Sequence, residues 1–156
     1  AGERILRAQL GDLDGLRFID NRVRRDGDDP HITILSPQEH KTAITTGVLT
    51  RELLGTVAIP DDFRVMGLGR ALGGGSTTYF VVLNWPGGEA FRASLGFDPG
   101  GPGGNGFHLT VGFDDAGDVH GVSKAKVWKA ASLRSSLIRL AYSRPDLQTR
   151  LLPLLK

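Results

Sequence analysis

The sequence contains no cysteine, and this absence removes three kinds of chemistry at once. Without a thiol, the chain forms no disulfide, holds no thiolate-ligated zinc ion and has no cysteine nucleophile. The sequence also lacks any run of 18 or more apolar residues, the length that a membrane-spanning helix requires. From these absences we expect a protein of the cytoplasm or the nucleus that does not enter a membrane.

The length and composition are those of one folded domain. The chain has 156 residues, of which 40% are hydrophobic and 23% are charged. Residues 1–118 carry 11 basic and 16 acidic side chains, whereas residues 119–156 carry eight basic side chains and one acidic one. The basic C-terminal part either binds a polyanion or forms a solvated helical surface. Because the first residue is not methionine, we expect a single domain over residues 1–156 that can also be a module of a longer protein.

Apolar spacing and capping residues predict a mixture of strands and helices. Apolar residues recur every three or four positions from Leu13 to Val23, which predicts a helix, and Ser36-Pro37-Gln38-Glu39 has the pattern of a capping box that begins another. The glycines of Gly73-Gly74-Gly75 predict a hairpin turn between two strands. We expect strands at 5–10, 31–35, 63–71, 77–85 and 107–113, and further helices at 89–95, 127–141 and 145–155.

This order of elements predicts an α+β fold rather than a doubly wound parallel sheet. Residues 125–156 are expected to form basic C-terminal helices that pack on the rest of the domain.

Two of the four histidines lie in the same short pattern, each within a predicted strand. The two segments are His31-Ile32-Thr33 and His108-Leu109-Thr110. Residues i and i+2 of a strand point to the same face, so each histidine projects together with its threonine, away from an apolar face. Gly112 is expected on that same face, where it leaves room for a ligand. If the two strands are neighbours, four polar side chains meet in one groove.

Such a set of side chains suits phosphate chemistry without a metal ion. A neutral imidazole can take a proton from water, and an imidazolium can give one to a leaving alkoxide, near neutral pH. Threonine hydroxyls can donate hydrogen bonds to phosphate oxygens as charge develops on them. The alternative is a pair of surface histidines that only exchange hydrogen bonds with nearby hydroxyls.

The paired motifs resemble those of the two-histidine (2H) phosphoesterase superfamily, which carries two H-x-T/S motifs on separate strands. This superfamily includes 2′,5′-RNA ligase-like proteins and cyclic nucleotide phosphodiesterases. Segments 65–70 and 80–85 look like the paired strands that precede its second motif. Segments 107–113 and 118–124 are similar to the Swiss-army-knife RNA-repair-like subgroup.

The resemblance implies a bilobal fold, in which two β-sheet/helix halves flank a central cleft. It implies His31 and His108 as the acid–base pair, Thr33 and Thr110 as phosphate clamps, and no cofactor. The expected substrate is RNA with a terminal cyclic phosphate or a cyclic nucleotide, opened by a monomeric phosphodiesterase in RNA repair or processing. An RNA-end binding module and a ligase that works in the reverse direction are the alternatives. Which histidine is the base is left open.

Three further residues have two interpretations each. Lys124 either supplies a positive charge to a phosphate or belongs to a solvated helix with its neighbouring lysines. Tyr79 and Trp85 either stack on a nucleobase or belong to the core.

The remaining histidines and a group of aspartates receive weaker assignments. We expect no role for His40, and we expect His120 in a turn, from which it could also approach the cleft. Asp26, Asp28 and Asp29 are most simply a hydrophilic turn, although one of them could raise the pKa of His31. No metal site is expected, because acid–base catalysis needs free ring nitrogens.

Overall fold

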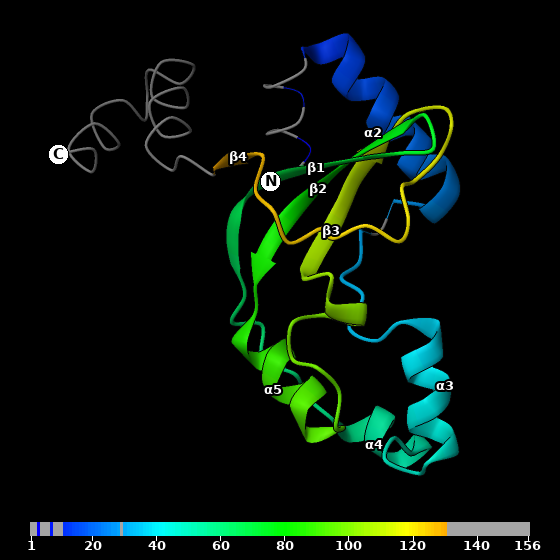
Figure 1. Ribbon diagram of the computed structural model, residues 1–156, viewed down its shortest axis with the longest axis vertical. Helices are drawn as coiled ribbons and strands as arrows, with labels where there is room; N and C mark the ends of the chain where they lie inside the picture. The colour runs from blue at the N-terminus through cyan, green and yellow to red at the C-terminus, as the bar shows by residue number, and fades with distance from the viewer. Residues whose placement is uncertain (1–2, 4–6, 8–10, 29, 131–156) are drawn as a thin grey trace, which may run out of the picture.

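A four-stranded antiparallel sheet forms the centre of the protein (Figure 1). The computed structural model describes residues 3, 7, 11–28 and 30–130. The strands lie in the order β3-β2-β1-β4. Their bounds are Arg64–Gly73 for β1, Ser76–Asn84 for β2, Phe107–Phe113 for β3 and Lys129–Ala130 for β4. The mixed helix and sheet content agrees with the predicted α+β class, but a second sheet, which a bilobal arrangement requires, is not among the described residues.

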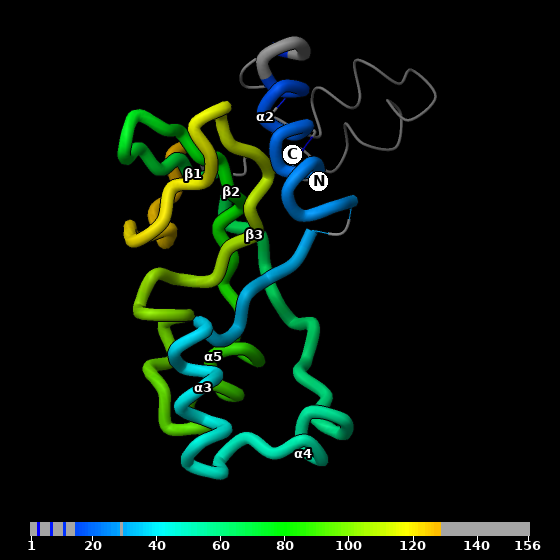
Figure 2. The backbone as a smooth tube through the Cα atoms, turned by 90° about the vertical axis from the view of Figure 1, so that its right-hand side faces the viewer, coloured from blue at the N-terminus to red at the C-terminus, as the bar shows by residue number. Residues whose placement is uncertain are grey.

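The helices gather at the two ends of the molecule. Helix α2 (Asp12–Asp26) lies beside β3 at one end. Helices α3 (Pro37–Thr45), α4 (Arg51–Thr56) and α5 (Pro86–Ser94) lie at the other end, as Figure 2 shows. None of the described helices is both long and apolar enough to cross a membrane.

The predicted start of α3 and the predicted hairpin are confirmed, whereas the helix predicted at 89–95 begins earlier, at Pro86. Ser36 Oγ accepts a hydrogen bond from the Glu39 amide, and the Glu39 carboxylate accepts one from the Ser36 amide at 2.7 Å, so the capping box of α3 is complete. Gly74 and Gly75 join β1 to β2 with φ angles of +58° and +78°, which a primed hairpin turn requires. Helix α4 was not predicted; Thr50 caps it.

The strand predicted at 31–35 is wrong except at one residue. Ile32 forms an isolated antiparallel bridge with Leu109 of β3. Two residues later the Ile34 carbonyl accepts a hydrogen bond from the Arg92 guanidinium at 2.7 Å, so the chain leaves the sheet. A side chain 58 positions away therefore replaces the strand partner that local sequence would suggest.

Two other predictions at the ends of the domain need correction. Arg7, the one residue of 5–10 that the structure describes, is helical and not in a strand. Val127 and Trp128 are not helical, and Lys129–Ala130 pairs with β1 as β4. The predicted basic helices over 125–156 therefore do not begin at 125, and residues 131–156 lie outside the described part of the chain.

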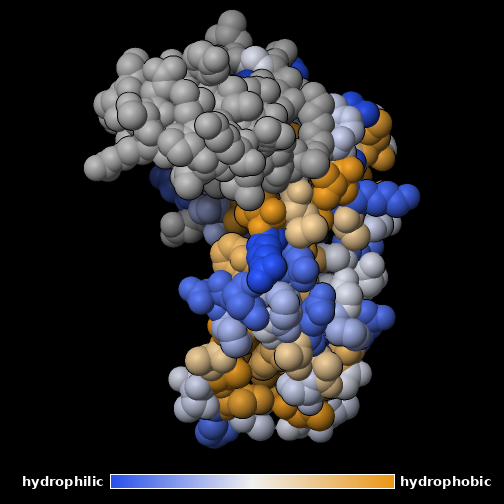
Figure 3. All heavy atoms as spheres, turned by 90° about the vertical axis from the view of Figure 1, so that its left-hand side faces the viewer, coloured by the Kyte–Doolittle hydropathy of each residue, from blue (hydrophilic) through white to orange (hydrophobic). Residues whose placement is uncertain are grey.

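The sheet has apolar side chains on both faces. On one face Phe18 and Ile19 of α2 pack over the larger cluster, which includes Tyr79, Val81 and Val111. The other face carries a smaller cluster, Ala71, Phe80, Val82 and Val119, and Val119 belongs to the loop that follows β3. The surface view in Figure 3 shows a hydrophilic band between two hydrophobic areas, the lower of them at the end where α5 lies.

A β-bulge in β3 changes which face its residues occupy. Phe80 pairs with Thr110 and Tyr79 pairs with Gly112, so Val111 is an extra residue in β3. The bulge turns Gly112 toward α2, where a Cβ atom would lie 2.5 Å from the Phe18 carbonyl. The expectation that Gly112 leaves the His-Thr face open is therefore wrong, because Gly112 instead allows α2 to approach the sheet.

Candidate functional site

The bridge between Ile32 and Leu109 places the two His-x-Thr segments side by side. In an antiparallel pair the neighbours of bridged residues are also opposite one another, so His31 lies beside Thr110 and Thr33 beside His108. All four side chains line one cavity of about 210 Å³. Among the described residues, its lining is Arg22, Arg25, Asp26, Pro30, His31, Thr33, His108, Thr110, Asp118, His120 and Lys124. The structure thus brings the four predicted side chains together, and their catalytic roles remain a prediction.

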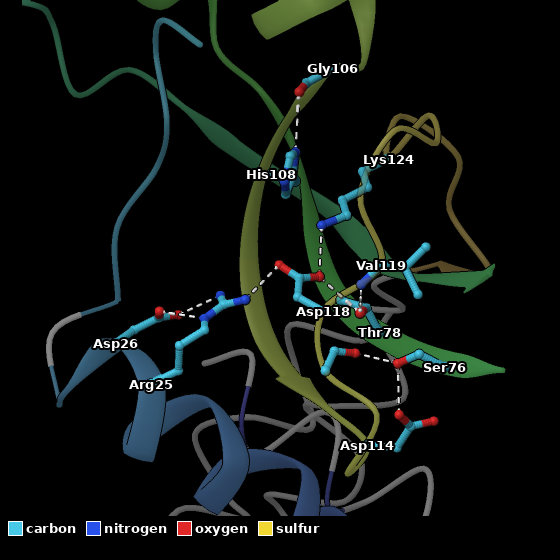
Figure 4. A network of polar contacts seen from close by, with 11 residues as sticks. Arg25, Asp26, Ser76, Thr78, Gly106, His108, Asp114, Asp118, Val119 and Lys124 are labelled. Carbon is cyan, nitrogen blue, oxygen red and sulfur yellow. Dashed lines mark hydrogen bonds and ion pairs between the residues drawn. The ribbon is translucent and has the colours of Figure 1, made fainter. Parts of the chain in front are cut away.

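The two motifs contribute unequally exposed side chains. His31 and Thr33 are exposed, whereas His108 and Thr110 of β3 are half-buried. His108 Nδ1 lies 3.3 Å from the Gly106 carbonyl oxygen (Figure 4). A carbonyl can only accept, so Nδ1 carries the hydrogen and the Nε2 of the neutral ring holds a lone pair. Burial lowers the pKa of His108, and the positive charge of Lys124 lowers it further, so the neutral ring is favoured at pH 7.

Asp118 is the centre of a polar network on the wall of the cavity (Figure 4). Its Oδ1 accepts hydrogen bonds from Thr78 Oγ1 at 2.8 Å and from Lys124 Nζ at 3.0 Å. Its Oδ2 accepts one from Arg25 at 3.2 Å. Burial alone would raise the pKa of Asp118, but the charge of Lys124 and these hydrogen bonds outweigh burial and lower it. The carboxylate therefore stays ionised.

The end of α2 supplies two arginines that the sequence did not single out. Arg25 donates to both oxygens of Asp26, at 2.6 and 2.7 Å, and its guanidinium lies 4.4 Å from the centre of the Phe113 ring. Arg22 is buried and donates to Glu3 at 2.8 Å. Arg22 and Arg25 are spaced three apart on one face of a helix that directly precedes the first motif, and this spacing was the signal available in the sequence.

Lys124 lines the cavity, whereas the two aromatic candidates do not. Lys124 is only 5% exposed and lies in a loop, so the solvated-helix interpretation is wrong. Tyr79 packs edge-on against Phe18, at 5.1 Å between ring centres, on the other face of the sheet. Trp85 is buried too, and its Nε1 donates to the Pro60 carbonyl at 2.6 Å. Their positions agree with the core interpretation and not with stacking on a substrate.

The remaining candidates are divided between the cavity and its surroundings. His120 is exposed and lines the cavity, while His40 of α3 does not. Asp26 lines the cavity as the partner of Arg25, and Asp29 lies outside the described residues. Among the residues that the structure describes, no three histidine or carboxylate side chains lie close enough together to hold a metal ion.

A second cavity of about 400 Å³ adjoins the first and shares Arg22, Pro30 and Thr110 with it. Most of its walls are apolar side chains, namely Ile32, Phe63, Val65, Val81, Leu83, Leu109 and Val111. Phe63 is the aromatic side chain in this lining. It is 42% exposed, so its ring is open to stacking with a ligand. Sequence reasoning did not find this cavity, because its walls come from five separate segments of the chain.

Comparison with known proteins agrees with the motifs. The model of the 2H-SAK family, described as the Swiss Army Knife 2H phosphoesterase domain, matches residues 9–120. The matched range contains both His-x-Thr segments and ends before Lys124. No curated protein and no solved structure gives a significant match. Because the family model covers more than half of the chain and both of its motifs, this chain belongs to the 2H-SAK family of 2H phosphoesterase domains.

Proposed function

We propose that the domain is a metal-independent phosphodiesterase that opens 2′,3′-cyclic phosphates, on RNA ends or on nucleotides, in RNA repair or processing. The family supports phosphodiesterase-type activity in general. The observation that carries the finer proposal is that both His-x-Thr segments line one small cavity. A volume of about 210 Å³ is below the usual range for a site that encloses a whole ligand, so it suits a phosphate and the atoms bonded to it.

The environment of His108 supports its assignment as the base. Its neutral ring presents the Nε2 lone pair, which takes a proton from water while the water oxygen bonds to phosphorus. The bond from phosphorus to the 2′ or 3′ oxygen breaks, and His31 as imidazolium donates its proton to that oxygen. Thr33 and Thr110 donate hydrogen bonds to the non-bridging oxygens, where negative charge increases in the transition state.

The adjoining apolar cavity supports a substrate with a nucleoside part. Phosphate oxygens would lie with the threonines and Lys124. The apolar walls belong to the face of the sheet that α2 covers, so a base or sugar would reach them past the residues that line both cavities, Arg22, Pro30 and Thr110. Aromatic stacking of a base on Phe63 would add affinity with little dependence on base identity.

The test is turnover of defined substrates in the presence of EDTA. The wild-type protein is incubated with the four 2′,3′-cyclic nucleotides and with an oligonucleotide that ends in a cyclic phosphate, and the products are mapped. We expect one phosphomonoester isomer from each, unaffected by the chelator, and almost none from a His31→Ala/His108→Ala variant. Loss of all activity in EDTA, with recovery in zinc or manganese, would contradict the metal-independent mechanism. Binding of the oligonucleotide without turnover would favour an RNA-end binding module.

A further inference from the structure

We propose that Asp118 is a positioning residue that holds the Lys124 ammonium in place, so that a fixed positive charge stands beside the His108 imidazole and the reacting phosphate. Neither residue belongs to the His-x-Thr segments, and Lys124 lies beyond the range that the family model matches. The catalytic part of this inference rests on the proposed function. The arrangement of the three side chains can be tested without a substrate.

The Asp118 carboxylate has an anchor on the sheet that does not depend on the two cations. Thr78 of β2 is completely buried, and its hydroxyl donates to Asp118 at 2.8 Å while accepting a hydrogen bond from the Val119 amide, also at 2.8 Å. The side chain of Asp118 is only 5% exposed. A buried carboxylate needs partners of opposite charge, so it draws the ammonium of Lys124 and the guanidinium of Arg25 to fixed points.

The Phe80 ring lies close to both Lys124 and His108. Its Nζ lies 5.9 Å from the centre of the Phe80 ring, and the same ring meets the His108 imidazole edge-on at 5.7 Å. Figure 4 shows the Lys124 side chain between His108 and Asp118. An ammonium has three N–H donors, and the ion pair with Asp118 occupies one of them, so a phosphate oxygen in the cavity can accept from another.

Several charged or titratable groups face His108. From the loop after β3, Lys124 disfavours the imidazolium and Asp118 favours it, and from the bridging segment His31 disfavours it. Arg25 of α2 and His120 also line the cavity. Lys124 has the largest effect among the charges, after burial. Removing Lys124 therefore raises the pKa of His108, whereas removing the charge of Lys126, which is not among the groups that shift His108, leaves that pKa unchanged.

The first experiment is an NMR titration of the histidine rings in the full chain, without substrate. Wild type is compared with Lys124→Met and with Lys126→Met, an exposed lysine on the same loop that serves as the matched control. We expect the His108 signals to titrate at higher pH in K124M and at the wild-type pH in K126M. An unchanged His108 titration in K124M would overturn the proposal.

The second experiment is a double-mutant cycle on the turnover of a 2′,3′-cyclic nucleotide. Asp118→Asn and Lys124→Met should each lower kcat/KM by about 10²-fold, the usual effect of losing one positioned donor. The double variant should be no worse than the worse single variant, because Asp118 acts through Lys124. Lys124→Arg keeps the charge and should retain more activity than K124M. Asp115→Asn, an exposed carboxylate of the same loop, is the control and should retain full activity.

Other outcomes distinguish failure of the positioning role of Asp118 from failure of the proposed function. Full activity in D118N, or losses that multiply in the double variant, would overturn the positioning role. If D118N does not fold, Asp118→Glu replaces it, since one added methylene displaces the ammonium while the charge is kept, and full activity in D118E would count equally against the role. If wild type opens none of the cyclic phosphates, the proposed function fails, and the His108 titration still decides whether Lys124 is held beside the ring.

Discussion

At the scale of single residues, the two histidines share a motif but not an environment. His108 is in the sheet, half-buried and hydrogen-bonded through Nδ1 to Gly106. His31 is exposed and lies outside the sheet. An identical tripeptide pattern therefore produces one imidazole that is held neutral and oriented, and another that is open to solvent. An acid–base pair needs such a difference, because its members must be in opposite protonation states.

Replacing either histidine by alanine should lower kcat by about 10²–10⁴-fold, the usual contribution of one general acid or base. Thr33→Ala and Thr110→Ala should each cost about 10²–10³-fold, since each removes one hydrogen bond to the transition state. Steady-state kinetics on a 2′,3′-cyclic nucleotide measures these losses, with His40→Ala as the control. Losses below about threefold in folded variants of both histidines would contradict the acid–base mechanism.

The rate should show a bell-shaped dependence on pH. The acid limb should lie below 6.5, the ordinary pKa of histidine, because burial and Lys124 lower the pKa of His108 and the base must be neutral. The alkaline limb reports loss of the proton from the acid of the pair. A pH–rate profile of kcat/KM measures both limbs, which belong to the coupled pair of histidines, and an acid limb above 6.5 would count against His108 as the base.

The four His and Thr residues could be singled out because the same His-x-Thr pattern occurs twice, although only the second motif lies in a strand, where residues i and i+2 share a face. Asp118 and Arg25 could not, since they meet only when the loop after β3 packs beside the end of α2. Tyr79 was ambiguous for a similar reason. An aromatic residue in a strand has the same local pattern whether its face is the site or the core, and only the packing of Phe18 shows which.

At the scale of elements, the bulge at Val111 joins the site to α2. By turning Gly112 toward the helix, it lets the backbone of α2 approach β3 closely while Thr110 still faces the cavity. The sequence predicted β3 and its alternation but not this extra residue, because a bulge leaves no mark in the apolar pattern until the partner strand is known.

Gly112→Ala should destabilise the fold by about 1–3 kcal/mol, the usual cost of overpacking. The new methyl group would lie 2.5 Å from backbone atoms of Phe18, which cannot move aside as a flexible side chain would. Urea unfolding measures the loss. Gly55→Ala in α4, where a Cβ has open space, is the control and should not destabilise. Equal stability of G112A and wild type would contradict the close approach of α2.

Hydrogen bonds from Arg92 connect α5 to the segment that carries the first motif. Arg92 of α5 is fully buried and donates to the Ile34 carbonyl at 2.7 Å and to Glu39 at 2.7 and 3.1 Å. The capping box could be read from the sequence, but the partner of Glu39 could not, because Arg92 lies 53 positions away. The same guanidinium thus holds both the start of α3 and the Ile34 carbonyl, where segment 31–35 has left the sheet.

The ion pair predicts a loss of stability in acid. Hydrogen bonds from Arg92 lower the pKa of Glu39 from 4.5 to about 2, so its contribution, on the order of 3 kcal/mol, is complete above pH 4.5 and is lost as the pH falls toward 2. Urea unfolding at a series of pH values should show this fall in wild type and a weaker one in Glu39→Gln. Glu89→Gln, at an exposed carboxylate of α5, is the control. A wild-type stability that stays constant from pH 5 to pH 2.5 would contradict the pair, because its contribution to stability declines over that range.

At the scale of the whole molecule, the site lies between the helix α2 at one end and the helices α3, α4 and α5 at the other. The second motif is part of the sheet, whereas the first lies on the connection that runs from α2 toward α3 (Figure 2). The family and the α+β class could be predicted, since both depend on local patterns and on the two motifs. The single described sheet could not, because strand order depends on contacts between distant segments.

The isolated bridge at Ile32 has a thermal consequence. The first motif is attached to β3 by one bridge, while the second motif shares the ladder of β2 and β3, so local opening of 30–35 requires less free energy than melting of the sheet. We expect catalysis to decline reversibly, on heating, at temperatures where the sheet is still intact. Initial rates measured beside far-ultraviolet circular dichroism would show the separation, and hydrogen exchange should be faster at Ile32 than at Val81. Coincident loss of rate and sheet signal would mean that both histidines are equally firmly held. The enzyme would then have no temperature range in which its sheet is intact but turnover has stopped.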